Sequence, residues 1–561
     1  MFWRTVTAFM YFVPLHESRS HRWLAALLIG CMWLVGSATA FAQSPRPAMP
    51  ELRVRGGLKG EEAIQALGRR LPEVAAHYHK SEAELRGMLR RDKSLRLDPQ
   101  GRLNYACEGL VAPVVSEGGE EVLLPAALAP LSDTFLLHSK PGSNRKIYLD
   151  FDGHTLANNA WTASNNGGTN IVAPPWNIEG SASDFSAAER TLIQQVWLRV
   201  AEDFAAFDVD VTTEYPGEAA LTRANAGDQV YGTRALVSAI SSYFGNYGGI
   251  AYVGAFDNTG DYYKPALIFP EKLSHNEKNI AEAISHEVGH NLGLSHDGIS
   301  GGDEYYRGQG NWAPIMGVGY SKPIVQWNRG DYASANNTEN DLNVIQANGL
   351  SYRPDDVGST IATAKVLSGL NLTNVGILER MNDVDFFAIQ SQGGAATFRI
   401  TPWERGANVH FQLALYDSAG TLLTNRQVAD TTSGVQPVAI NRVLAAGTYY
   451  VSVEGVGSGD PLTTGYSDYG SLGNYTFTAS LPAPIPVTPV PTNLTLTVVA
   501  NQLQLSWPAD HIGWRLEAQT NAVGVSLGTN WFNVAGATAT NRVFIPINAA
   551  NGSVYFRLAY P

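Results

Sequence analysis

The stretch from His286 to Asp297 constrains the fold more than any other part of this 561-residue chain. It reads His-Glu-Val-Gly-His-Asn-Leu-Gly-Leu-Ser-His-Asp. His286 and His290 are four residues apart, so on a helix they share one face, about one turn apart, and can bind one metal ion. Gly293 stands where a helix commonly ends in a left-handed residue, and the turn could bring His296 back as a third ligand. Three imidazoles would leave one position on a zinc ion open to water.

Residues on either side also indicate a helix. Residues 274–277, Ser-His-Asn-Glu, have the spacing of a capping box and predict that the helix begins near Asn276. Ile280, Ile284 and Val288 form an apolar stripe roughly opposite the two histidines. Glu287 would then lie beside the metal, where its carboxylate can take a proton from an attacking water and pass it to the leaving amine.

Taken together, these residues are similar to HExxHxxGxxHD, the signature of the metzincin metalloproteases. The final aspartate, Asp297, resembles the reprolysin and gametolysin-like branches. The resemblance implies proteolysis, with an α+β catalytic domain made of a mixed sheet and the zinc helix. It also implies a methionine turn beneath the zinc, for which residues 313–317 are the candidate. Met316 would support the site without binding metal, and Glu287 would be the catalytic residue.

Other interpretations of the stretch remain open. A bare HExxH can occur as surface residues of a helix that binds no metal, although the added glycine, third histidine, aspartate and methionine favour zinc. The chain could be a β-rich adhesion or carbohydrate-binding protein with an inactive protease domain. It could also be a zinc hydrolase that acts on a non-peptide amide.

Composition and net charge give no reason to expect a nucleic-acid partner. With 44% hydrophobic and 16% charged residues the chain is ordinary globular material, and its length allows about three or four domains. The net charge of −12 gives no electrostatic argument for nucleic acid, so we expect no polynucleotide partner.

The first 42 residues predict export. Arg19 and Arg22 precede an apolar run at 23–35, and small residues then lead to a cleavage site after Ala42. The alternative is a membrane anchor, but the run is short for a span and ends in small residues. We therefore expect a secreted, extracellular protein with no stable membrane span.

Removing this signal peptide leaves Cys107 as the only cysteine, so an intrachain disulfide is excluded. Some metzincin propeptides hold a cysteine sulfur on the zinc and exclude water until the propeptide is removed. Cys107 is therefore a candidate latch of a zymogen. The alternative is an inert, small buried cysteine.

Helical spacing at 61–71 and 82–91, and a strand, turn and strand at 95–103, suit a propeptide, with a linker at 139–143 near the activating cut.

The predicted catalytic domain contains a strand at 146–151, a helix after a capping box at 186–189, and a strand at 207–213. Asp150 and Asp152 could hold structural calcium or simply form a turn. Tyr320 lies four residues after the methionine, whereas some metzincins place a zinc-contacting tyrosine two after, so packing is favoured for it.

A segment about thirty residues before the zinc helix resembles the edge strand that lines the metzincin cleft. Its backbone would bind protein or peptide substrates as an added strand, and the alternative is an ordinary buried strand. The predicted cleft residues are Gly249, Ile250, Ala251 and Tyr252.

The rest of the chain predicts two all-β, sandwich-like domains. Residues 356–481 resemble the bacterial pre-peptidase C-terminal domain, in which Asp383 and Asp385 are candidate calcium ligands or surface-loop residues. A proline-rich linker at 482–492 leads to a fibronectin III-like domain at 493–561. Either module could bind a surface or polymer. The predicted order is signal peptide 1–42, propeptide 43–143, metzincin domain 144–355, and then these three segments.

Overall fold

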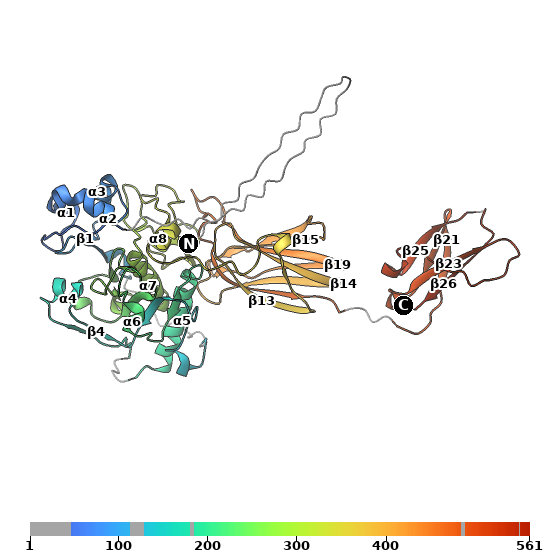
Figure 1. Ribbon diagram of the computed structural model, residues 1–561, viewed down its shortest axis with the longest axis horizontal. Coiled ribbons are helices and arrows are strands. Elements are labelled where there is room, and N and C mark those ends of the chain that lie inside the picture. The colour runs from blue at the N-terminus through green and yellow to red at the C-terminus, as the bar shows by residue number, and fades with distance from the viewer. Residues whose placement is uncertain (1–45, 113–127, 180–183, 484–487, 549, 561) are drawn as a thin grey trace, which may run out of the picture. The chain divides into compact units, whose positions relative to one another are not determined.

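The computed structural model describes residues 46–112, 128–179, 184–483, 488–548 and 550–560 (Figure 1). The predicted signal peptide lies outside the described residues. Among the described helices, none is both long and apolar enough to cross a bilayer.

The histidine stretch belongs to a region built on a seven-stranded mixed sheet of order β1-β2-β8-β9-β7-β3-β6. Strand β3 pairs parallel with β6 and β7, and β7 pairs parallel with β9. Strands β8, β2 and β1 then follow with antiparallel pairing. The bounds are β1 Leu95–Leu97, β2 Leu103–Cys107, β3 Arg145–Asp150, β6 Asp210–Thr212, β7 Tyr231–Val237, β8 Gly249–Tyr252 and β9 Ala266–Ile268. A mixed sheet is what the family resemblance implies here, but its first two strands, β1 and β2, come from the predicted propeptide.

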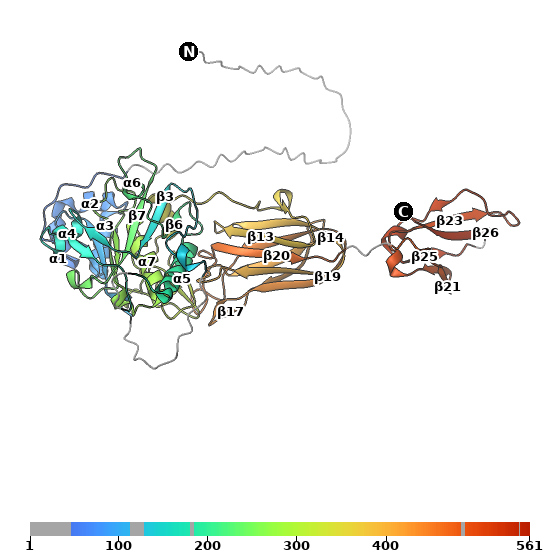
Figure 2. The ribbon, with the colours of Figure 1, turned by 90° about the horizontal axis from the view of Figure 1, so that it is seen from below.

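Two long helices, α5 (Ala187–Asp203) and α7 (Glu277–Asn291), pack against each other and against the sheet (Figure 2). The predicted capping box of α5 is present, because Ser186 Oγ accepts from the Glu189 amide (3.2 Å) and the Glu189 carboxylate accepts from the Ser186 amide (2.8 Å). Its core-facing residues include Ile193, Val196 and Val200.

The start of α7 differs from the prediction in its mechanism. Asn276 caps the helix, and its side-chain oxygen accepts from the amides of Lys278 (3.0 Å) and Asn279 (3.2 Å). The predicted capping box at 274–277 is wrong, because Ser274 and His275 have φ of +57° and +49° and form a left-handed turn before the helix. The predicted starting region is nevertheless correct.

The predicted propeptide packs into the same core as the central sheet. Helices α1 (Gly60–Leu67), α2 (Leu71–His77) and α3 (Glu82–Arg91) bury leucines and valines in one cluster with residues of α5 and α7. Helix α3 has the bounds that the sequence predicts. Since the β1–β2 hairpin also extends the sheet, residues 46–112 cover one edge of it.

The linker predicted at 139–143 is fixed to the sheet rather than free. The Ser139 amide donates to Val211 O (3.0 Å), and Ser143 Oγ donates to Asp208 O (3.0 Å). Hydrogen bonds at both ends of the segment hold it against β6 and the residues just before that strand.

The region after residue 356 is all-β, as predicted. Its main sheet has the order β13-β20-β14-β19-β15-β16, and Figure 2 labels β13, β20, β14 and β19 of this sheet. The region has a buried core of its own. The bounds are β12 Lys365–Val366, β13 Asn371–Leu378, β14 Val384–Pro402, β15 Phe411–Tyr416, β16 Leu422–Gln427, β17 Asp430–Thr431, β18 Gly434–Val435, β19 Val438–Gly455 and β20 Gly473–Ser480.

The last described region forms two three-stranded sheets around a small core of its own. One sheet comprises β21 Thr495–Val499, β22 Gln502–Ser506 and β25 Arg542–Pro546, and the other β23 Arg515–Asn521, β24 Phe532–Asn533 and β26 Ser553–Ala559. Shorter elements near the central sheet are β4 His154–Leu156, α4 Ala160–Asn165, β5 Ile171–Ala173, α6 Glu218–Leu221, β10 Trp312–Pro314, β11 Ile324–Gln326 and α8 Asp341–Ala347.

Candidate metal centre

Helix α7 carries two of the three histidines into the interior. The apolar stripe of Ile280, Ile284 and Val288 packs in the core, as predicted, while His286 and His290 face the end of β2. Both histidines are fully buried. The helix ends at Asn291, and Gly293 then adopts φ +95°, which a side chain would strain. The chain turns there and returns His296 to the same point.

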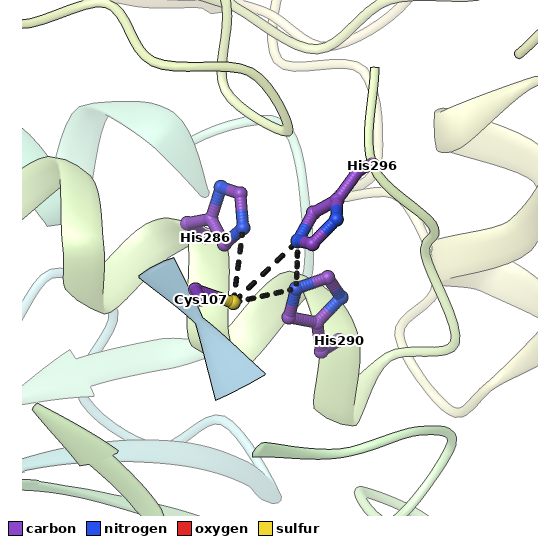
Figure 3. A group of neighbouring side chains, drawn as sticks. All are labelled: Cys107, His286, His290 and His296. Atoms are coloured by element: carbon purple, nitrogen blue, oxygen red, sulfur yellow. Dashed lines mark hydrogen bonds between the residues drawn. The ribbon is translucent and has the colours of Figure 1, made fainter. Parts of the chain in front are cut away.

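Four donor atoms converge there, from the three histidines and Cys107 (Figure 3). Cys107 Sγ lies 3.7 Å from His286 Nε2 and 3.5 Å from both His290 Nε2 and His296 Nε2. The Nε2 atoms of His290 and His296 are 3.2 Å apart. Tetrahedral zinc, with Zn–S of about 2.3 Å and Zn–N of about 2.05 Å, places sulfur and nitrogen about 3.6 Å apart and two nitrogens about 3.3 Å apart. The donor set therefore fits zinc in both chemistry and spacing.

Each imidazole is oriented through its second nitrogen. His286 Nδ1 lies 2.9 Å from Ile315 O, and His290 Nδ1 lies 2.8 Å from Leu294 O. A proton held on Nδ1 leaves the Nε2 lone pair directed at the common centre. Burial, reinforced by the neighbouring histidines, also lowers the pKa values of His286 and His290 well below 6.5. Neutral rings of this kind are the form that binds metal.

Glu287 is the unusual carboxylate of the site. It is fully buried, and neither of its oxygens has a hydrogen-bond partner among the described residues. Burial raises its pKa well above the usual value. A buried carboxylate without protein partners is costly unless a further group satisfies it. A water at a metal centre would be such a group.

The predicted supporting residues pack close to the ligands. Met316 is fully buried, and its sulfur lies so near Gly289 of α7 that an added Cβ would be 2.6 Å away. Its carbonyl accepts from the Asp297 amide (2.9 Å), which ties the methionine turn to the residue after the third histidine. The Asp297 side chain is buried against Asn337 (3.4 Å), and burial together with Glu339 raises its pKa.

The predicted cleft strand β8 does not form an edge of the sheet, because β2 pairs with it and β1 lies beyond β2 at the edge. The pairs are Asn104 with Tyr252, Tyr105 with Ala251, Ala106 with Ile250 and Cys107 with Gly249. Beyond Cys107, the Leu110 carbonyl accepts from the Tyr320 hydroxyl (2.7 Å), and the Ala112 amide donates to Lys272 O (2.9 Å). Residues 103–112 therefore run along the strand expected to bind substrate and past the metal centre.

Several residues of the site have no signal in the sequence. Asp92 Oδ2 lies 2.8 Å from His296 Nδ1, and the Tyr105 ring stacks on His290 at 4.2 Å. Tyr305 lies 4.2 Å from the His296 ring, and its hydroxyl is 2.7 Å from Ser94 Oγ. None of them stands at a recognisable spacing from the histidines, so only the folded chain brings them together.

The two candidate calcium sites differ. Asp150 forms an ion pair with the buried guanidinium of Arg234, and its carboxylate accepts from the Gly153 amide (3.1 Å). These contacts correspond to the predicted alternative in which Asp150 and Asp152 form a turn and hold no calcium. Asp383 and Asp385 instead gather with Asp355, with ligand oxygens within 4.8 Å of one another. One oxygen of Asp385, which is fully buried, has no partner among the described residues.

One family model matches the region that contains the three histidines. Residues 205–297 match the family model described as Metallo-peptidase family M12B Reprolysin-like. This match ends at the aspartate after the third histidine and agrees with the resemblance of the sequence. No match was found among curated proteins.

Similar solved structures include the pre-peptidase C-terminal domain of a collagenase from Bacillus anthracis, at 15% identity and TM-score 0.15, covering 23% of this chain and 100% of that one. The surface-associated copper-binding protein CorA of Methylomicrobium album BG8 is 10% identical with TM-score 0.16, over 21% of this chain and 98% of that one. A β-glucosidase from Paenibacillus barengoltzii is 17% identical with TM-score 0.13, over 22% of this chain and 12% of that one. Similarity at this level supports no conclusion about function.

Proposed function

We propose that this chain, whose residues 205–297 match the reprolysin-like M12B metallopeptidase family model, is a zinc-dependent endopeptidase made as a latent precursor. One observation carries the proposal: three imidazole nitrogens and one thiol converge at the separations that tetrahedral zinc requires. His286, His290 and His296 are the proposed permanent ligands. Cys107 is the fourth donor in the precursor.

In the proposed reaction, zinc supplies Lewis acidity, which polarises a peptide carbonyl and makes a water molecule more acidic. Glu287 accepts the proton of the attacking water and delivers it to the leaving amine. Its place suits this role, because it follows His286 on helix α7 and neither of its oxygens has a hydrogen-bond partner among the described residues. Strand β8 holds the substrate backbone by β-pairing, as it holds β2 in the precursor.

Latency has two components in this proposal. Cys107 occupies the position that a water needs, and residues 103–112 occupy the strand that a substrate needs. Removal of the propeptide would free both. The predicted signal peptide further leads us to propose that the protein is exported and acts outside the cell.

A second proposal concerns calcium in the β-rich region after residue 356. Asp355, Asp383 and Asp385 present carboxylates to one point, and Glu379 also has a buried oxygen without a partner in the described part of the chain. Oxygen ligands of this kind suit calcium. Its role would be structural.

The test uses a chain with a cleavage sequence for an added protease inserted between Ala112 and Leu128. After the cut and removal of the propeptide, casein digestion by the wild type is compared with digestion by the Glu287→Ala variant. The zinc content of both proteins is measured as well. We expect the wild type to digest casein and the variant to keep zinc without digesting. Zinc without proteolysis in the cut wild type would favour the adhesion alternative, and activity only on small amides would favour the non-peptide hydrolase.

A further inference from the structure

The three proposed zinc ligands are not supported in the same way. His286 and His290 have their Nδ1 atoms on backbone carbonyls, those of Ile315 and Leu294, which belong to the same region as the ligands. His296 has its Nδ1 on a carboxylate, Asp92 Oδ2, at 2.8 Å. Asp92 lies in the predicted propeptide, just after helix α3. One ligand is therefore oriented by a segment that activation would remove.

The Asp92 carboxylate is held firmly in place. Its other oxygen accepts from the Ser94 amide at 2.9 Å, and its own amide donates to Met88 O at 3.0 Å at the end of α3. The residue is 6% exposed, and the His296 side chain is 1% exposed. This contact is therefore a shielded, charge-assisted hydrogen bond rather than a surface ion pair.

The ring of His296 is also enclosed by aromatic side chains. Tyr105 of the propeptide lies 4.3 Å from it and Tyr305 lies 4.2 Å from it, measured between ring centroids. Because two rings and a carboxylate fix it, His296 has little freedom to turn its Nε2 atom away from the centre. Two of these three restraints come from the propeptide.

We propose that Asp92 is a positioning residue for His296, through which the propeptide tightens zinc binding in the precursor beyond what Cys107 contributes. The inference rests on the proposed zinc site. A carboxylate on the outer nitrogen of a ligating histidine fixes its tautomer and raises its basicity, and loss of such a partner typically lowers metal affinity 10- to 100-fold. The propeptide would then assist metal loading as well as block the cleft.

The test measures zinc dissociation constants of the uncut, full-length chain by competition with a chelator at constant pH. The variants are Asp92→Asn, which keeps the shape and removes the charge, Cys107→Ala, and the double variant. Glu73→Gln, at a half-exposed carboxylate that pairs with Arg70, is the matched control. We expect Asp92→Asn to weaken zinc binding 10- to 100-fold both with and without Cys107, and the control to remain within about twofold of wild type.

A structural role of Asp92 in folding the propeptide is separated by thermal unfolding with and without zinc. Our inference predicts a smaller zinc-induced rise of Tm in Asp92→Asn than in wild type. Equal rises, with a dissociation constant within twofold of wild type, would overturn it while leaving the zinc site intact. Absence of zinc binding by the wild type itself would overturn both this inference and the proposed function.

Discussion

If the latch were the cysteine alone, replacing it would activate the uncut precursor. Residues 103–112 are also held by contacts that do not involve the thiol. Four hydrogen bonds join residues 103–112 to the rest of the region. They run from Val253 N–H to Leu103 O (3.0 Å), from Gly248 N–H to Cys107 O (3.0 Å), from Tyr320 O–H to Leu110 O (2.7 Å) and from Ala112 N–H to Lys272 O (2.9 Å). At about 1 kcal/mol each they contribute about 4 kcal/mol, which favours the closed state about 1000-fold.

We therefore predict that uncut Cys107→Ala keeps its cleft closed. Its activity on a quenched fluorogenic peptide should be below about 1% of that of the cut wild type, since only about one molecule in 1000 would be open. The same variant, once cut and freed of its propeptide, should be as active as the cut wild type, which controls for damage to the site. Uncut Cys107→Ala with activity comparable to the cut enzyme would refute the reasoning, because the strand would then contribute nothing to latency.

Three further predictions concern a close contact in the cleft, the pH dependence of the acidic cluster and the effect of calcium on that cluster. A Cβ on Gly249 would lie 2.5 Å from the Glu287 carboxylate, so Gly249→Ala should displace it and lower kcat about 10-fold or more in the cut enzyme without loss of zinc, whereas Gly302→Ala should have no effect. In the acidic cluster, burial raises the pKa of Asp385 to about 8 and that of Glu379 to about 10. The folded state then binds more protons than the unfolded state from about pH 4 up to about pH 8 for Asp385 and about pH 10 for Glu379, so the stability of this region should fall as pH rises through that window. Calcium at about 100 times its Kd should add about 2.7 kcal/mol at pH 8, and Asp385→Asn should abolish this gain in thermal unfolding.

Local patterns in the sequence predict the parts of the fold that local chemistry determines. The apolar stripe of α7 and the capping box at Ser186 correspond to the structure because a helix is set by contacts three or four residues apart. The capping box at 274–277 failed because Ser274 and His275 form a left-handed turn, so the cap is Asn276, which accepts from the amides of Lys278 and Asn279 instead of the Glu277 amide that Ser274 would have capped.

What the sequence does not reveal is long-range pairing. Nothing near Leu103 indicates that β2 will pair with β8, about 145 residues later, because strand partners are chosen by tertiary packing. For the same reason, Asp92 and Tyr305 could not be assigned to the site from the sequence. The histidines could be assigned, because helical spacing places His286 and His290 together and the glycine turn allows His296 to join them. Cys107 was recognisable only as the sole cysteine of the exported chain.

X-ray absorption at the zinc edge, measured on the chain before and after cutting, tests the central claim most directly. We predict one sulfur at about 2.3 Å and three nitrogens at about 2.0 Å in the uncut chain, and no sulfur once the propeptide is removed. A zinc shell without sulfur in the uncut chain would contradict the account, as would a sulfur ligand that persists in the cut, active enzyme.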